Sequence, residues 1–352
     1  MNNPHLLIIR FSAMGDVAML VPVVASLANT YPNLRITVLS QPFARAFFEK
    51  LAPNVSFMEA RLKKEDKGIK GLNAIYRRLQ AKHFTAVADM HDVLRTKYLR
   101  MRFNVDRYKV AHINKHRKEK RQLCSKDNKQ LRQLPTSFSN YADVLSKLGY
   151  PTDLSFTSIF DSSGAPLSEL QAAIGTKAEG DRWIGIAPFA AHKGKILPVE
   201  KTEEVINTLI HNNPQCRIFL FGGGEREMKQ FSEWKEKHPQ CTIVGNHLKG
   251  LSQELILMSQ LNVMLSMDSA NMHLASLVNT PVVSIWGATH PYAGFMGWNQ
   301  KESNAVQLPL ACRPCSVYGG KPCHRGDYAC LNDIKPETIV EKIENIIGSQ
   351  SR

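Results

Sequence analysis

Acidic residues are fewer than basic ones, and long apolar runs are absent, in this sequence of 352 residues. Lys and Arg number 45 against 31 Asp and Glu, which leaves a net charge of +14 at pH 7. That imbalance indicates an anionic partner such as a nucleic acid, a membrane surface or a phosphorylated small molecule. No run reaches the roughly 18 apolar residues of a membrane-spanning helix. Arg10 and Asp16 interrupt the apolar start, which disfavours a signal peptide. We therefore expect a cytoplasmic protein.

The pattern Asp-x-Asp, in which paired carboxylates hold a divalent cation, is also absent. A transferase acting on a nucleotide sugar would then neutralise the diphosphate with Lys side chains and backbone amides. In a reducing compartment, the seven cysteines favour metal binding or simple packing over disulfides. Cys312, Cys315, Cys323 and Cys330 have the spacing C-x2-C-x7-C-x6-C. These four thiols are candidates for a structural zinc site, with ordinary packing as the alternative.

Hydrophobic residues make up 43% of the chain, which suits globular structure, and the length favours two domains. Short apolar strands alternate with helical patterns in both halves, which predicts two doubly wound parallel sheets. We expect domains at 1–165 and 181–352, with a linker within 151–181. The predicted strands are 6–9, 34–39, 85–89, 183–188, 217–221, 263–266 and 281–285. The predicted helices are 16–29, 44–51, 69–82, 94–103, 199–211, 225–237, 269–278 and 336–347.

Two strand-to-helix turns carry candidate functional groups. In the first, Ser12, Gly15 and Asp16 join the first strand to its helix. Asp16 is either an N-terminal helix cap or a general base, with Gly15 allowing a ligand to approach the backbone. In the second, Asp268 and Ser269 precede a helix whose first amides suit a diphosphate. His273 lies one turn later, as a structural residue or a ligand contact.

Two further loops of the second half are weaker candidates. Lys193 and Lys195 follow a predicted strand, where a Lys can reach a phosphate or remain solvated. Gly222, Gly223, Gly224 and Glu225 form a glycine turn that is neither a complete dinucleotide fingerprint nor a Walker loop. The turn would let a nucleotide approach the backbone closely, or it is a tight strand-to-helix corner with no ligand.

Taken together, these segments resemble the heptosyltransferases, family 9 of the glycosyltransferases, almost end to end. The resemblance rests on residues 8–17 (IIRFSAMGDV) with Pro22, 195–198 (KILP), 223–225 (GGE), 268–275 (DSANMHLA), 280–283 (TPVV) and 287–291 (GATHP). It implies a GT-B fold, in which two Rossmann-like domains face a central cleft. It further implies an inverting, metal-independent transferase in lipopolysaccharide core synthesis that needs no cofactor and takes its sugar from a nucleotide sugar, ADP-heptose in this family.

The resemblance also implies a role for each matching residue. Asp16 would be the catalytic base and Lys195 would contact the donor phosphates. Asp268 would hold donor-sugar hydroxyls, and Ser269, Ala270, Asn271 and His273 would surround the diphosphate. The remaining expected donor contacts are Ser12, Gly15, Gly223, Gly224 and Glu225. Ala270 stands where the family usually has Gly, and Leu197 where Trp is common, so the donor sugar is the least determined feature.

The positive charge is concentrated in one segment. Residues 95–132 contain fourteen Lys and Arg and only three acidic residues, so this tenth of the chain carries most of the net charge. By the resemblance, the first domain receives a phosphorylated lipopolysaccharide core acceptor at the inner face of the inner membrane. The expected acceptor contacts are His91, Arg95, Lys115, Arg117, Lys118, Lys120 and Arg121. The alternatives are a solvated basic helix, a transferase for another nucleotide sugar, and a nucleic-acid-binding protein, the last disfavoured because the segment contains no recognised reading motif.

Overall fold

The computed structural model describes residues 4–160 and 164–350 and divides the chain into two compact units. The first unit comprises residues 1–115 and 135–159, and the second comprises residues 116–134 and 160–352. The predicted linker 151–181 overlaps residues 161–163, which lie outside the described residues. Within the described part of the chain, no helix combines the length and the apolar character that are needed to cross a bilayer.

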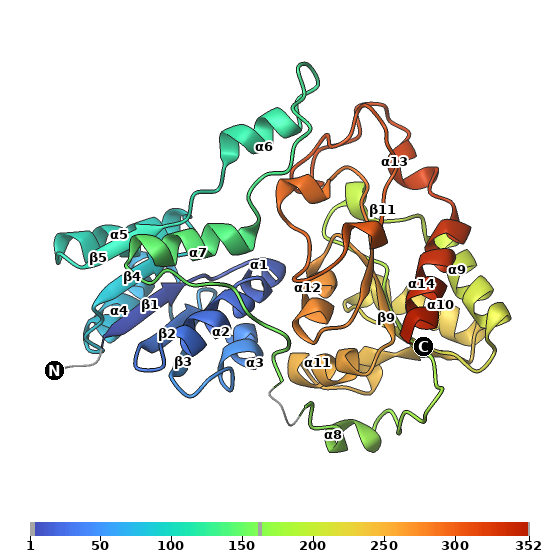
Figure 1. The fold of residues 1–352 in the computed structure, drawn as a ribbon, viewed down its shortest axis with the longest axis horizontal. Coiled ribbons are helices and arrows are strands. Elements are labelled where there is room, and N and C mark those ends of the chain that lie inside the picture. The colour runs from blue at the N-terminus through green and yellow to red at the C-terminus, as the bar shows by residue number, and fades with distance from the viewer. Residues whose placement is uncertain (1–3, 161–163, 351–352) are drawn as a thin grey trace. The chain divides into compact units, whose positions relative to one another are not determined.

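The first unit is a parallel sheet of five strands in the order β3-β2-β1-β4-β5 (Figure 1). The strands are β1 (His5–Ile9), β2 (Arg35–Ser40), β3 (Val55–Glu59), β4 (Ala86–Asp89) and β5 (Lys109–His112). The helices are α1 (Met14–Ala18), α2 (Val21–Thr30), α3 (Arg45–Phe48), α4 (Gly68–Gln80), α5 (Leu94–Val105) and α7 (Ser137–Lys147), with the 3-10 turn η1 (Pro42–Ala44) before α3.

The central strands of this sheet are buried on both faces, as their continuous apolar sequences predict. Leu7 and Ile9 of β1 pack into one core with α4 and α5. Their neighbours Leu6 and Ile8 are also fully buried and, because side chains alternate along a strand, face the opposite side. On the α4 and α5 side, Tyr76 of α4 and Phe103 of α5 pack edge to face, with ring centroids 4.9 Å apart.

The second unit is a parallel sheet of six strands in the order β11-β10-β9-β6-β7-β8. The strands are β6 (Trp183–Ala187), β7 (Arg217–Leu220), β8 (Cys241–Ile243), β9 (Val263–Met267), β10 (Val282–Ile285) and β11 (Ala305–Val306). The helices are α6 (Arg117–Leu123), α8 (Ser168–Gln171), α9 (Val199–Asn212), α10 (Glu225–Lys237), α11 (Leu251–Ser259), α12 (Ala270–Leu277), α13 (Ala329–Asn332) and α14 (Pro336–Gln350). Short 3-10 turns are η2 (Lys193–Lys195), η3 (Val244–Asn246), η4 (Pro291–Ala293) and η5 (Glu302–Asn304).

Helices α9, α10 and α14 lie together in Figure 1 and share one core with the strands of the second sheet. Phe231 and Trp234 of α10 and Ile343 of α14 are fully buried there. Helix α12 packs against β9 and β10, and also against α11. The two parallel sheets with their helices confirm the predicted α/β class and the pair of doubly wound units.

Several local features differ from the sequence prediction; helices α7 and α11, for example, were not predicted. The helix expected at 16–29 is divided into α1 and α2, because Pro22 has no amide to bond the carbonyl one turn earlier. Strands β3, β5, β8 and β11 were not predicted, and all four lie in the outer part of a sheet. The segment 116–134 groups by its contacts with the second unit, whereas the prediction assigned all of 1–165 to one domain.

Candidate active site

Asp16 lies in the first turn of α1, directly after the loop that follows β1. Its Oδ2 accepts a hydrogen bond from the Ala13 amide (3.1 Å) and forms an ion pair with Arg10 Nη2 (3.0 Å). Arg10 is buried, donates to the Met90 carbonyl oxygen, and has its guanidinium 5.5 Å from the ring centroid of Tyr141. The Tyr141 hydroxyl donates to the backbone oxygen of Asp16 (3.1 Å). The side chain of Asp16, about a third exposed, is thus fixed from β1, β4 and α7 and remains open to a substrate.

His91 follows β4 and lies beside the same loop. Its Nδ1 accepts from the Phe11 amide (3.4 Å), which places its proton on Nε2, 3.5 Å from Ser12 Oγ. Asp89 holds the turn by accepting from the amide of His91 (2.9 Å), and Arg100 in turn pairs with Asp89 (3.1 Å). The structure therefore brings Ser12, Asp16 and His91 together at the carboxyl end of the first sheet.

The environment of His91 disfavours its charged form. Burial, followed by the nearby Arg10 and Lys115, lowers the pKa of His91 to about 3. His91 is therefore a neutral imidazole near pH 7, able to donate a hydrogen bond to a hydroxyl but unable to act as a cation for a phosphate.

The other predicted acceptor residues fall into two groups. Arg95 is exposed in the first turn of α5, and Lys115 donates to the Asp92 carbonyl oxygen (3.4 Å), so both belong to the first unit. Arg117, Lys118, Lys120 and Arg121 lie on α6 in the second unit. Lys120 is buried, with its Nζ 4.1 Å from the ring centroid of Phe295, whereas the other three are exposed.

In the second unit, Lys195 and Asp268 meet across the carboxyl ends of β6 and β9. Lys195 Nζ is 2.8 Å from Asp268 Oδ2, and both side chains are largely buried. Gly319 covers the aliphatic part of Lys195: its φ is +78°, and a Cβ there would lie 2.6 Å from Lys195 Cγ. Sequence reasoning missed Gly319, because it is far from Lys195 along the chain and no motif marks it.

The turn after β9 delivers the N-terminus of α12 to the same place. Ser269 has extended backbone angles and makes no side-chain cap to the helix; its Oγ lies 3.2 Å from Ser266 Oγ. The amides that follow, beginning with Ala270 and Asn271, are those of the first helical turn, which favours an anion. His273 is buried on this helix. The structure therefore brings Lys195, Asp268 and the N-terminus of α12 together on one edge of the second sheet.

The glycine turn after β7 depends on a residue that the sequence did not single out. Glu227 Oε2 accepts from the Gly223 amide (2.8 Å), and a Cβ on Gly222 would lie 2.4 Å from that oxygen. Gly224 has a φ of +90° and directly precedes Glu225, the first residue of α10. Two of the glycines are therefore needed for the backbone of the turn itself.

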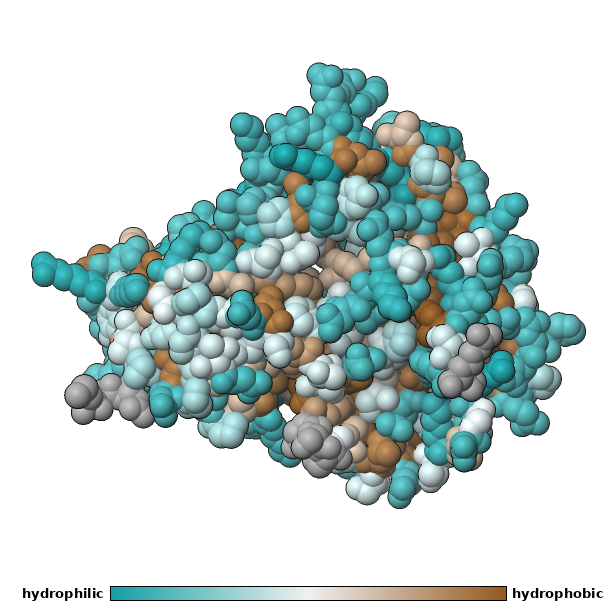
Figure 2. All heavy atoms as spheres, viewed as in Figure 1, coloured by the Kyte–Doolittle hydropathy of each residue, from teal (hydrophilic) through white to brown (hydrophobic). Residues whose placement is uncertain are grey.

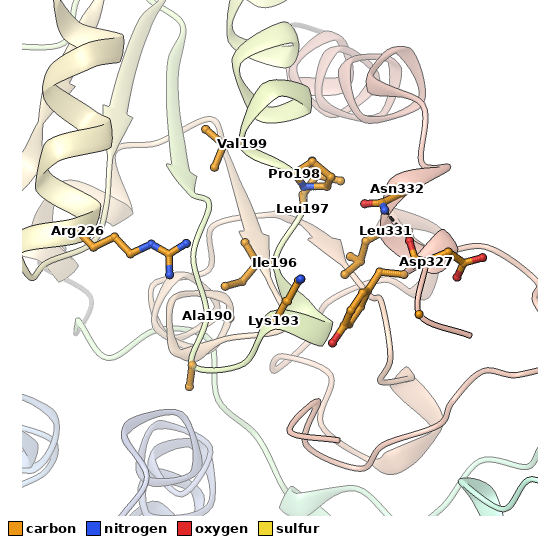
Figure 3. A pocket seen from close by; sticks show the side chains of 13 residues that line it. Ala190, Lys193, Ile196, Leu197, Pro198, Val199, Arg226, Asp327, Leu331 and Asn332 are labelled. Atoms are coloured by element: carbon orange, nitrogen blue, oxygen red, sulfur yellow. Dashed lines mark hydrogen bonds between the residues drawn. The ribbon is translucent and has the colours of Figure 1, made fainter. Parts of the chain in front are cut away.

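A pocket of about 610 Å³ opens beside this edge of the second unit (Figure 3). Its walls include Ile196, Leu197 and Tyr328, and Lys193 and Arg226 enter it from opposite sides. Lys193 Nζ lies 4.9 Å from the ring centroid of Tyr328. Three residues of the predicted motif 195–198 line this pocket, Ile196, Leu197 and Pro198. Leu197 stands at the position where Trp is common in the resembling family.

The four late cysteines are free thiols. Burial raises the pKa of Cys330 to about 11 and also raises the pKa of Cys315. Among residues 4–160 and 164–350, no group of three or more His, Cys, Asp or Glu is arranged to hold a metal ion.

Comparison with known proteins places these features in a family. The family model "Glycosyltransferase family 9 (heptosyltransferase)" matches residues 72–322, more than half of the chain. Lipooligosaccharide heptosyltransferase 2 of Campylobacter jejuni is 28% identical over 37% of this chain, and the match spans 40% of that relative's length. Lipopolysaccharide heptosyltransferase 1 of Campylobacter coli is 22% identical over 97% of this chain and 99% of its own.

Solved structures agree on the fold. A glycosyl transferase family 9 protein from Veillonella parvula has a TM-score of 0.74 at 18% identity, covering 99% of this chain and 98% of its own. Heptosyltransferase WaaC of E. coli with ADP has a TM-score of 0.68 at 16% identity, covering 97% and 99%. The predicted GT-B fold is confirmed, and the chain belongs to glycosyltransferase family 9, the heptosyltransferase family.

Proposed function

We propose that this protein is an inverting, metal-independent heptosyltransferase that moves heptose from ADP-heptose to a phosphorylated lipopolysaccharide core acceptor. The observation that carries the donor half is the buried pair of Lys195 and Asp268 beside the N-terminus of α12. A cation and free helix amides suit a diphosphate, and a carboxylate suits sugar hydroxyls. ADP-heptose is favoured because a relative solved with ADP and another described as an ADP-heptose heptosyltransferase share this fold.

In the proposed reaction, Asp16 takes the proton of an acceptor hydroxyl as its oxygen attacks the anomeric carbon. The bond from that carbon to the diphosphate breaks, and ADP leaves with the electron pair. Lys195 and the first amides of α12 stabilise the charge that develops on the diphosphate. A single displacement from the face opposite the leaving group inverts the anomeric centre. Metal independence is supported by the absence of Asp-x-Asp and by the Lys195 cation.

The acceptor half is assigned to the first unit and to α6 of the second. His91 lies beside Asp16 and offers a neutral hydrogen-bonding group, while Arg95 and Lys115 supply positive charge. The exposed Arg117, Lys118 and Arg121 of α6 are proposed to meet acceptor phosphates. Because the acceptor is carried on a lipid, we place the protein in the cytoplasm, peripheral at the inner face of the inner membrane.

Assays with a panel of nucleotide sugars test the proposal. We expect turnover with ADP-heptose and a core acceptor, release of ADP, and no loss of rate in excess EDTA. Strong turnover of a hexose donor, with no turnover of ADP-heptose, would contradict the proposed donor but would still agree with an inverting glycosyl transfer. Absence of transfer from every donor, with salt-dependent binding to DNA or RNA, would favour a nucleic-acid-binding protein instead.

A further inference from the structure

Exposed large apolar side chains concentrate on two helices of the first unit. Helix α5 presents Leu94 (86% exposed), Met101 (51%) and Val105 (72%), and α4 presents Ile69 (66%). With 3.6 residues per turn, the three α5 residues fall within about 40° of one another around the helix axis. The buried residues of α5, including Leu99 and Phe103, lie on the opposite side. The three exposed residues therefore form one apolar stripe along the outer side of α5.

Side-chain contacts fix how α4 lies beside this stripe. Tyr98 of α5 donates to Asn73 Oδ1 of α4 (2.8 Å), and about two turns further on Gln80 of α4 donates to Asp106 at the end of α5 (2.7 Å). The two helices therefore run parallel and in register. Ile69 lies one turn before Asn73, as Leu94 lies one turn before Tyr98. Both apolar side chains thus sit at the helix N-termini, the edge of the unit that also holds Asp16 and His91.

The charge around the stripe is positive and largely uncompensated. Residues 61–109 contain fourteen Lys and Arg and five Asp and Glu. The acidic side chains already have partners; for example, Asp66 pairs with Arg78 (2.6 Å) and Asp92 with Arg100 (3.3 Å). Among the described residues of this range, ten cations have no ion pair with an acidic side chain: Lys63, Lys64, Lys67, Lys70, Arg77, Lys82, Arg95, Arg102, Arg107 and Lys109.

These cations adjoin the apolar residues along the chain. Lys67 and Lys70 flank Ile69, Arg95 follows Leu94, and Arg107 lies two residues after Val105. Figure 2 shows hydrophobic side chains between hydrophilic ones over the region of α5. A helix face that alternates apolar side chains with long cations suits a lipid interface, where the apolar groups enter the acyl boundary and the cations reach the phosphates.

We propose that this α4–α5 face, formed by Ile69, Leu94, Met101 and Val105 with the cations beside them, inserts shallowly into an anionic phospholipid surface. The inference rests on the proposed function in one respect, because a lipid-linked acceptor would be presented at such a surface. The face begins at the helix N-termini beside His91, so docking through it would bring the acceptor side of the first unit to the lipid headgroups.

Vesicle binding of the full chain tests this inference. We expect the protein to co-sediment with phosphatidylglycerol-containing vesicles, less so with rising salt, and to bind pure phosphatidylcholine vesicles weakly. The double variant Met101→Ser/Val105→Ser should reduce the partition coefficient about tenfold, because it removes apolar groups that enter the bilayer. Lys67→Gln/Lys70→Gln should weaken binding and flatten its salt dependence. The matched control is Leu167→Ser, a 40%-exposed leucine in the second unit.

A fluorescent probe tests the location directly. All four native Trp residues lie at or after position 183, so Val105→Trp places a single indole in the first unit. Vesicles with brominated lipid should quench this variant more strongly than the wild-type protein. Absence of vesicle binding, equal binding by the double variant and the wild type, or a Val105→Trp indole that brominated lipid leaves unquenched while the protein is bound would each overturn the inference.

Transfer to a delipidated, water-soluble acceptor separates this inference from the proposed function. Met101→Ser/Val105→Ser should keep that activity while losing vesicle binding. A protein that binds vesicles through this face but transfers no sugar would overturn the function alone. A protein that transfers normally and ignores anionic vesicles would overturn the docking face alone.

Discussion

At the scale of single residues, the reaction depends on how the Asp16 carboxylate is held. The ion pair with Arg10 and the bond from the Ala13 amide orient one oxygen, and both partners lie within a few residues of Asp16. The Arg10 guanidinium is itself fixed by the Met90 carbonyl, eighty residues away. The sequence motif could therefore identify the carboxylate, but the groups that position it come from elements that meet only in the folded sheet.

Asp16→Asn should lower kcat by about 10²- to 10⁴-fold, because the amide keeps the shape of the side chain but cannot accept the proton. The affinity for ADP-heptose should stay close to that of the wild type, since Lys195, Asp268 and the N-terminus of α12, the groups proposed to hold the diphosphate and sugar, lie in the second unit. Steady-state kinetics and calorimetry measure the two quantities. Asp143→Asn, at an exposed position of α7, is the control for loss of a carboxylate. Unchanged turnover of Asp16→Asn would show that Asp16 is not the base.

His91 gives a pH-dependent prediction whose sign is fixed by its environment. Its pKa falls from an ordinary 6.5 to about 3 in the folded protein. Between pH 3 and pH 6.5 the imidazole is therefore protonated in the unfolded chain and neutral in the folded protein. The contribution of His91 to stability is therefore present above pH 6.5 and is lost as the pH falls toward 3. At pH 5 the loss should be about 2 kcal/mol.

Urea unfolding at pH 7 and pH 5 checks this prediction. His91→Asn should lose less stability on acidification than the wild type, whereas His83→Asn, at an exposed position, should behave like the wild type. The same fall in stability for His91→Asn and wild type would mean that folding does not lower the pKa of His91.

At the scale of elements, the sequence predicted the central strands and their helices but not the outer strands. Buried central strands such as β1 and β9 are continuous apolar runs, which periodicity detects. Strand β5 (KVAH) is exposed or partly exposed at most of its positions, and β11 has only two residues. Such strands are stabilised by pairing with a neighbouring strand, so the sequence of their own residues is not enough to predict them.

At the donor site, Gly319 contacts Lys195, a residue far away along the chain, so its role depends on the folded structure and not on local sequence. Gly319→Ala should destabilise the protein and lower the affinity for ADP about tenfold or more, because the new Cβ would displace the Lys195 side chain from Asp268. Gly326→Ala is a matched control: its φ is +82°, close to that of Gly319, but a Cβ there meets nothing within 4 Å. The free energy of unfolding of the control should fall only by the cost of a left-handed backbone at an Ala, about 1–2 kcal/mol.

Thermal unfolding and calorimetry with ADP distinguish the two glycine variants. Equal stability and equal ADP affinity of Gly319→Ala and Gly326→Ala would show that contact with Lys195 is not what requires glycine at position 319.

At the scale of the whole molecule, the basic segment is divided between the two units. Residues up to Lys115 belong to the first unit, while 116–134 is fastened to the second. Lys129 Nζ donates to the Ala311 (3.1 Å) and Pro314 (3.0 Å) carbonyls, and the Leu134 amide donates to Tyr292 (2.9 Å). Counting charges along the sequence located the concentration of cations, but only packing reveals that it is shared between two units.

This division makes charge reversal on α6 informative. Arg117→Glu/Lys118→Glu/Arg121→Glu should raise KM for the phosphorylated acceptor about tenfold or more at low salt, because three exposed cations become repulsive. ADP affinity should stay nearly unchanged, since none of the three belongs to the Lys195 and Asp268 group. The control Lys229→Glu/Lys249→Glu/Lys301→Glu changes the net charge equally at exposed positions of the same unit. If the control raises KM as much as the α6 variant does, the effect comes from net charge alone. If the α6 variant weakens the binding of acceptor and of ADP equally, α6 has no specific role toward the acceptor.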